Sequence, residues 1–152
     1  MSEAYFYHLT VQPLEQTLPK LLGLARKAGW RIAVRGVAQD RLEWLDGKLW
    51  EGDGFLPHGI AGGPHDEDQS VLLTTGSAGN APDCLISVDG AEIAPEEIAP
   101  LKRVMIIFDG NDGDALSVAR GQWKSLTEAE IPAKYWSQES GSWEMKAQHP
   151  KA

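Results

Sequence analysis

The sequence predicts a single α/β domain with a mainly parallel central sheet and helices on both faces. Strand-like and helix-like segments alternate in the first third of the chain, which is how an α/β fold begins. Three later apolar runs are nearly continuous rather than alternating, which is typical of strands covered on both faces. A length of 152 residues with 42% hydrophobic content suits one compact domain.

The first third of the chain predicts two strand–helix pairs. Residues 4–9 and 31–35 are rich in β-forming side chains. Residues 13–28 have the apolar spacing of a helix with one buried stripe, and Pro19 within them predicts a kink or a later helix start. Residues 38–50 predict a second amphipathic helix. The stripe of the first helix consists of Leu14, Leu18, Leu21, Leu22 and Ala25.

The remainder of the chain predicts the other strands and a third helix. Residues 51–69 are rich in glycine and lack periodicity, which indicates a long loop of the kind that often has a function. Residues 112–126 predict a helix, and residues 144–152 predict a polar, flexible tail beyond a domain that spans 1–143. The further strands are expected at 71–75, 84–88, 104–108 and, as a last edge strand, 133–138.

Composition limits the classes of function. The net charge of −8 argues against a broad basic face that grips nucleic-acid phosphates, so strong direct DNA binding is not expected. The single cysteine, Cys84, lies in an apolar run where a buried thiol is ordinary, which favours a reducing, cytoplasmic location. No apolar stretch is long enough to span a membrane, and no export signal is recognisable.

The candidates for catalytic chemistry all have simpler explanations. Asp109, Asp112 and Asp114 follow a predicted central strand and could form a magnesium site of a small hydrolase or phosphoryl-transfer enzyme. Turn formation and capping of the next helix explain the same carboxylates. The turn at 76–80 lacks the helix that a phosphate loop requires, and the acidic and histidine residues at 58–68 match no zinc-ligand spacing. The sequence therefore predicts no catalytic residue, metal or cofactor.

Two clusters of side chains are candidates for binding partners. The first surrounds the start of the glycine-rich loop, where large apolar side chains are exposed unless a partner covers them or they fold back onto the core. We call this cluster the loop patch; its members are Trp50, Phe55, Leu56, Pro57 and His58.

The second cluster, which we call the helix patch, consists of Arg120, Trp123 and Lys124 on the predicted helix 112–126. A helical wheel places Trp123 on an apolar stripe and the two cations along its edge. Two cations beside an aromatic ring suit an acidic peptide that ends in an apolar residue. A solvated helix flank explains the charges equally well. The stripe also contains Ala115, Leu116, Ala119 and Leu126.

An ordered set of motifs resembles the chi subunit family of the bacterial DNA polymerase III clamp-loader complex. The motifs extend over residues 4–137 and occur in the order that the family has. They are the segments Tyr5-Phe6-Tyr7-His8-Leu9, Leu45-Asp46-Gly47-Lys48-Leu49-Trp50, Phe55-Leu56-Pro57-His58, Leu72-Leu73-Thr74-Thr75, Ile107-Phe108-Asp109-Gly110, Ala119-Arg120-Gly121-Gln122-Trp123-Lys124 and Tyr135-Trp136.

The resemblance implies a Rossmann-like domain without nucleotide chemistry that bridges the clamp loader and single-stranded DNA-binding protein in DNA replication. By similarity, the helix patch receives the acidic, phenylalanine-ended tail of single-stranded DNA-binding protein. The loop patch faces the psi subunit or a helicase. The acidic loop at 59–70 and the tail after Trp143 follow no motif of the family.

Overall fold

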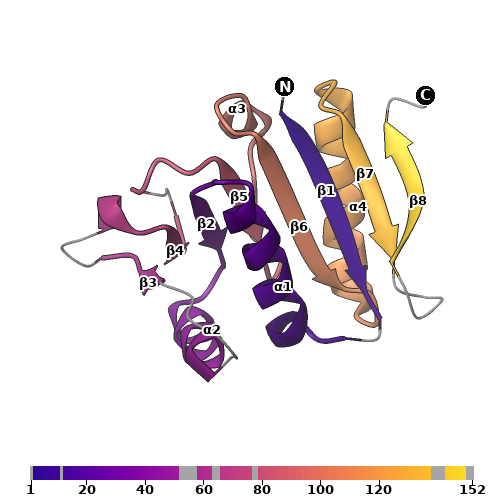
Figure 1. The fold of residues 1–152 in the computed structure, drawn as a ribbon. Coiled ribbons are helices and arrows are strands. Elements are labelled where there is room, and N and C mark those ends of the chain that lie inside the picture. The colour runs from indigo at the N-terminus through magenta and orange to yellow at the C-terminus, as the bar shows by residue number, and fades with distance from the viewer. Residues whose placement is uncertain are drawn as a thin grey trace.

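The part of the chain that the structure describes forms one eight-stranded sheet with four helices (Figure 1). The computed structural model describes residues 2–10, 12–51, 58–62, 66–76, 79–137 and 143–149, apart from the side chain of Trp50. The strands are β1 (Glu3–Leu9), β2 (Ile32–Arg35), β3 (Gly59–Ile60), β4 (Val71–Thr74), β5 (Cys84–Ser87), β6 (Arg103–Asp109), β7 (Ala133–Ser137) and β8 (Glu144–His149). The helices are α1 (Leu14–Lys27), α2 (Gln39–Glu51), α3 (Pro95–Ile98) and α4 (Gly113–Glu128), with a short 3-10 turn, η1 (Asp66–Asp68).

The sheet has the order β3-β4-β2-β5-β6-β1-β7-β8. Each neighbouring pair is parallel except β7 and β8, which are antiparallel. The predicted α/β fold with a mainly parallel sheet is therefore confirmed. A Rossmann-like assignment is not, because β1 lies between β6 and β7 instead of following the 3-2-1-4-5-6 order of that fold.

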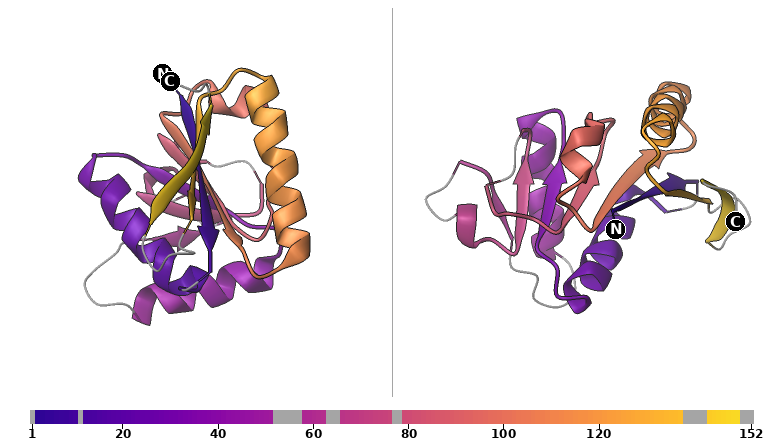
Figure 2. Two further views of the ribbon diagram at one scale, coloured as in Figure 1. Left: turned by 90° about the vertical axis from the view of Figure 1, so that its right-hand side faces the viewer. Right: turned by 90° about the horizontal axis from the view of Figure 1, so that it is seen from above.

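Two hydrophobic clusters cover the two faces of the sheet. Helix α1 packs Leu18 and Leu22 against one face, and α4 packs Ala119 and Leu126 against the other. Figure 2 shows α1 and α4 on opposite sides of the sheet, with α2 crossing near the ends of the parallel strands. The short α3 contributes Ile98 to the cluster on the α4 side. The prediction of helices on both faces is confirmed.

Three local features differ from the sequence-based expectations. Helix α1 begins at Leu14 and runs through Pro19, so a later start was wrong. The segment expected to be one long loop contains β3 and η1. Residues 144–149 form β8 rather than a flexible tail, so β7 is not the edge of the sheet. Pairing with β7 gives this polar segment the backbone hydrogen bonds that its composition alone could not predict.

Cys84 lies within β5 and is buried, as its apolar surroundings predicted. Burial raises the pKa of its thiol to about 12, so the reactive thiolate is disfavoured at neutral pH. Among the described residues, no helix combines the length and the apolar character that a membrane span requires.

Candidate protein-docking site on helix α4

Helix α4 carries the helix patch and starts at a side-chain cap. The carboxylate of Asp112 accepts hydrogen bonds from the backbone N–H groups of Asp114 at 2.9 Å and Ala115 at 3.4 Å. These bonds satisfy donors that the first helical turn leaves without partners. The predicted apolar stripe faces the sheet, with Ala119 and Leu126 buried. The stripe therefore fixes the rotation of α4 and the direction in which its cations point.

Trp123 lies between the sheet and the surface. Its ring makes edge-on contacts with Phe6, at a centroid distance of 5.2 Å, and with Tyr135, at 6.0 Å. Trp123 remains partly exposed, whereas Arg120 and Lys124 are exposed. Neither cation forms an ion pair or a side-chain hydrogen bond with any other residue that the structure describes. The three side chains thus provide an aromatic ring that is fixed by its packing on the sheet and two cations that a ligand can reach.

Tyr135 contacts the Trp123 ring, and His8 in turn holds Tyr135. The sequence did not indicate this role. His8 Nδ1 and the hydroxyl oxygen of Tyr135 lie 2.6 Å apart, and the His8 ring also packs against Phe108. Tyr135 in turn meets the Trp123 ring edge-on. Both residues belong to motifs of the chi-like set, but only the parallel pairing of β1 with β6 and β7 brings them under α4.

The structure describes only part of the loop patch. Phe55, Leu56, Pro57 and the side chain of Trp50 lie outside the described residues, so their predicted role remains a prediction. The side chain of His58 is 0% exposed, and its Nε2 lies 3.0 Å from the Asp46 carboxylate of α2. Since a buried ring cannot touch a partner in this conformation, His58 contacts α2 instead of contributing to the surface.

Two of the three aspartates of the alternative metal site act locally. Asp109 accepts a hydrogen bond from the backbone N–H of Asn111 at 2.9 Å, and Asp112 caps α4. Among the described residues, no three histidine, cysteine, aspartate or glutamate side chains are grouped so that they could hold a metal ion. Turn formation and capping thus account for Asp109 and Asp112, and nothing in the structure supports the hydrolase alternative.

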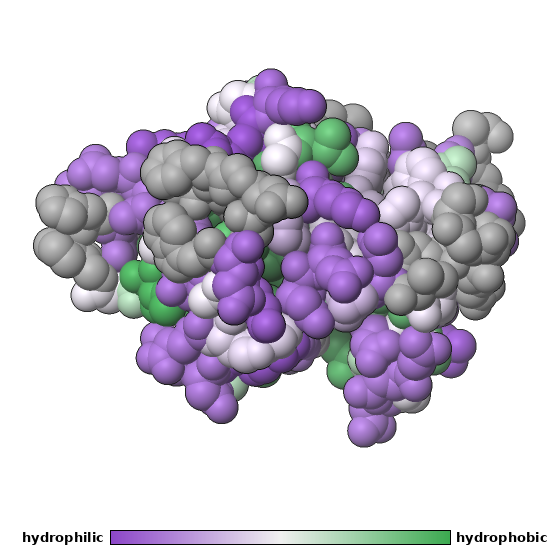
Figure 3. Space-filling model, turned by 60° about the horizontal axis from the view of Figure 1, so that its bottom comes forward, coloured by the Kyte–Doolittle hydropathy of each residue, from purple (hydrophilic) through white to green (hydrophobic). Residues whose placement is uncertain are grey.

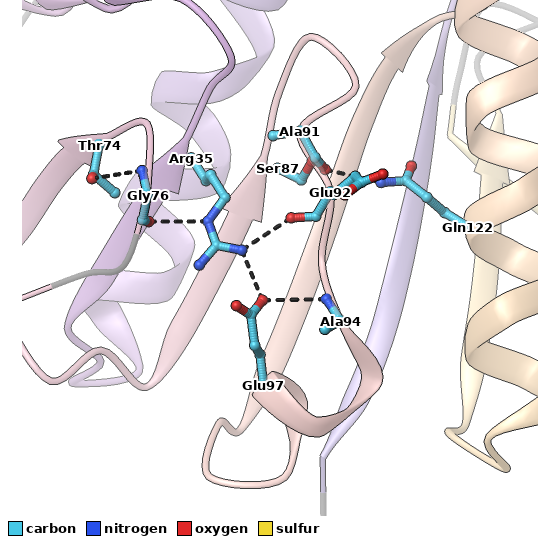
Figure 4. A network of polar contacts seen from close by, with 9 residues as sticks. All are labelled: Arg35, Thr74, Gly76, Ser87, Ala91, Glu92, Ala94, Glu97 and Gln122. Atoms are coloured by element: carbon cyan, nitrogen blue, oxygen red, sulfur yellow. Dashed lines mark hydrogen bonds and ion pairs between the residues drawn. The ribbon is translucent and has the colours of Figure 1, made fainter.

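An arginine at the end of β2 holds the loops on the α4 side of the sheet together (Figure 4). Arg35 donates to the carbonyl oxygens of Gly76 at 3.1 Å and Glu92 at 3.0 Å, and to the Glu97 carboxylate at 2.7 Å. The hydrogen bond from Arg35 holds the pKa of the Glu97 carboxyl below its ordinary value. Arg35 therefore connects three segments that are distant in the sequence.

The same network reaches α4. Gln122 donates its side-chain N–H to the carbonyl oxygen of Ala91 at 2.9 Å, and the Ser87 hydroxyl donates to the same oxygen at 2.6 Å (Figure 4). Gln122 is the neighbour of Trp123 in the sequence, so this contact ties the helix patch to the turn after β5. No role was predicted for Gln122 or Arg35 from the sequence, because their partners belong to segments that are remote in the chain.

Comparison with known proteins identifies the family. A search of curated protein sequences found no match. Among solved structures, the C-terminal domain of the DEAD-box protein Dbp5 is similar, with a TM-score of 0.59 and 14% identity over 91% of both chains, which shows a shared fold and no more. The family model described as DNA polymerase III chi subunit, HolC, matches residues 1–134. The motifs carried by β1, β6 and α4 all lie within this match, and the chain belongs to the DNA polymerase III chi subunit family.

Proposed function

We propose that this protein is an adaptor of the DNA polymerase III clamp-loader complex that binds single-stranded DNA-binding protein through the helix patch. Membership of the chi family supports a role as an accessory subunit in DNA replication. The adaptor acts in the cytoplasm and has no catalytic residues of its own. The observation that carries the proposal is the presence, on α4, of two exposed cations beside an aromatic ring that the core holds in place.

The expected ligand of the helix patch is the acidic C-terminal tail of single-stranded DNA-binding protein. Arg120 and Lys124 offer charge-assisted hydrogen bonds to carboxylates, which are stronger than hydrogen bonds between neutral groups. The partly exposed ring of Trp123 offers apolar area to the terminal phenylalanine of the tail, and salt does not screen this contact. Affinity should therefore fall with rising ionic strength without disappearing.

Calorimetric titration of a synthetic tail peptide tests the proposal. Arg120→Ala should weaken binding by about 1.5 to 3 kcal/mol, because the lost hydrogen bonds involve charged groups. Arg26→Ala is the matched control, since Arg26 is an exposed arginine on α1, which covers the other face of the sheet. A peptide that lacks the terminal phenylalanine should bind weakly to the wild type. Equal affinity of the Arg120→Ala and Arg26→Ala variants would refute the assignment.

The loop patch is proposed as the second docking surface, for the psi subunit or a helicase. The family assignment supports a partner within the polymerase complex. From the sequence we assign the large apolar side chains of Trp50, Phe55, Leu56 and Pro57 to this surface. Two separate docking surfaces are what an adaptor requires.

A further inference from the structure

A pocket of about 660 Å³ lies at the side of the molecule where the parallel strands end. The starts of α1, α2 and α4 surround it, and the ends of β1 and β6 form its floor through Leu9, Ile107 and Phe108. In Figure 3, which brings this side forward, hydrophilic residues cover most of the surface and apolar residues show between them. The pocket therefore combines an apolar floor with a polar rim.

The strand order explains why a pocket forms at this position. Strands β1 and β6 are neighbours, but the chain leaves β1 for α1 on one face of the sheet and leaves β6 for α4 on the other. The two connections diverge and leave a crevice beyond the strand ends. In open α/β sheets this is the place where ligands bind.

The charges around the pocket select the kind of ligand. Among the described residues, five carboxylates and one guanidinium line the pocket. The guanidinium belongs to Arg41, which donates hydrogen bonds to both carboxylate oxygens of Asp89 at 3.0 and 3.3 Å. The Asp112 carboxylate already occupies the start of α4 as its cap. Phosphate groups are therefore repelled from the helix start, where α/β folds often bind them, and cationic groups are attracted to the pocket. The carboxylates are Glu15, Asp89, Asp109, Asp112 and Asp114.

The wall of the pocket also carries an exposed apolar side chain. Val118 of α4 lines the pocket and is 44% exposed, so its side chain offers apolar area that a ligand can cover.

We propose that this pocket is a docking groove for a basic segment of a partner protein. An apolar side chain of that segment packs on the floor beside Val118, and flanking lysine or arginine side chains contact the carboxylates of the rim. The net charge of −8 on the whole chain adds long-range attraction for such a partner. The groove is separate from the helix patch: Val118 and Arg120 are two residues apart on α4, so they point to nearly opposite sides of the helix.

A short peptide of alternating arginine and leucine is the probe, and its binding is measured by calorimetry and by backbone amide chemical shifts. Val118→Arg places a cation on the rim and should weaken binding about tenfold, as expected when an interface anchor is lost. Val37→Arg is the matched control, because Val37 is an exposed valine outside the pocket lining. A peptide of alternating arginine and serine should bind more weakly, and a glutamate–leucine peptide should not bind.

The outcomes separate this proposal from its alternatives. Shifted amides at the ends of β1 and β6, with weakened binding only in Val118→Arg, would support the groove. Equal binding of the two arginine peptides, or equal affinities of the Val118→Arg and Val37→Arg variants, would overturn it, as would ATP binding in the same pocket. Val118→Arg should still bind the tail peptide at the helix patch, so failure here is distinguishable from failure of the proposed function.

Discussion

At the scale of single residues, Gly110 shows why one position in a chi-like motif must lack a side chain. A Cβ atom at this position would lie 1.9 Å from two atoms of the His8 ring and 2.7 Å from the Leu9 carbonyl oxygen. The ring cannot move away freely, because its other nitrogen is held 2.6 Å from the Tyr135 hydroxyl. Two motifs that are about a hundred residues apart in the chain, Tyr5–Leu9 and Ile107–Gly110, are thus in direct contact.

Gly110→Ala should lower the free energy of unfolding by about 1 to 3 kcal/mol, the usual cost of forcing extra atoms into a packed site. Gly121→Ala is the control, because Gly121 lies within α4 with no neighbouring atom within 4 Å of an added Cβ. Alanine there should stabilise the helix by about 0.5 to 1 kcal/mol. Urea unfolding of both variants decides the matter. Equal effects would mean that the His8 contact is not a constraint.

The Arg35–Glu97 pair predicts a pH dependence of stability. Its hydrogen bond lowers the pKa of Glu97 from the ordinary value of 4.5, so folding favours the charged carboxylate. The stabilisation is complete above the unfolded-state pKa and is lost as the pH falls through the lower folded-state pKa. The Glu97 side chain is 39% exposed, so we expect a contribution of no more than about 1 kcal/mol.

Urea unfolding of Glu97→Gln and the wild type between pH 7 and pH 3 tests this expectation. The difference in unfolding free energy between the two proteins should be constant near neutral pH and shrink below about pH 4.5. Glu96→Gln, at the exposed neighbouring position, is the control. A difference that does not change with pH would show that the ion pair contributes nothing.

At the scale of elements, β8 protects the edge of the sheet. It pairs antiparallel with β7, and Lys146 is an extra residue in the pairing, because Ala147 lies opposite Tyr135 and Met145 opposite Trp136. A bulge and a lysine on an edge strand both discourage pairing with another chain. Strand β8 therefore covers the backbone groups of β7 and presents an edge that resists further pairing.

Deletion of residues 144–152 should destabilise the fold and promote association between molecules, because it exposes the unpaired edge of β7. Sedimentation at several protein concentrations measures association, and thermal unfolding measures stability. Deletion of residues 150–152 alone keeps β8 and serves as the control. If the longer deletion associates no more than the control and keeps its stability, β8 has no protective role.

At the scale of the whole molecule, the acidic charge separates protein docking from DNA binding. A net charge of −8 repels phosphates over long distances, whereas Arg120 and Lys124 act on a peptide in direct contact. A single-stranded oligonucleotide should therefore not bind at physiological ionic strength under conditions in which the tail peptide does. Fluorescence anisotropy with a labelled oligonucleotide tests this, and salt-sensitive binding to the wild type would contradict it.

The two ends of the loop patch predict different consequences of mutation. Trp50→Ala or Phe55→Ala should leave the domain folded and weaken binding to a clamp-loader or helicase partner by about 2 kcal/mol, as for interface anchors. His58→Ala should instead reduce stability, because it removes a buried contact with Asp46. Circular dichroism and binding measurements on the same samples separate the two effects. Loss of fold in Trp50→Ala would show that this residue belongs to the core.

The sequence alone determined the order and type of the main elements and the family. Apolar periodicity identified α1, α2 and α4, because burial of a helix face depends on local spacing. Continuous apolar runs identified β4, β5 and β6, and the wheel of α4 placed Trp123 toward the sheet and Arg120 at its edge. The ordered motifs identified the chi family, which the family match confirmed.

Only the tertiary structure decided how distant segments meet. The contact of His8 with Gly110, the bonds of Arg35 to two loops and to α3, and the burial of His58 depend on strand order, which local spacing does not encode. Strand β8 was missed because a polar edge strand has no apolar pattern and depends on the backbone groups of β7. The acidic pocket likewise exists because neighbouring strands send their helices to opposite faces of the sheet.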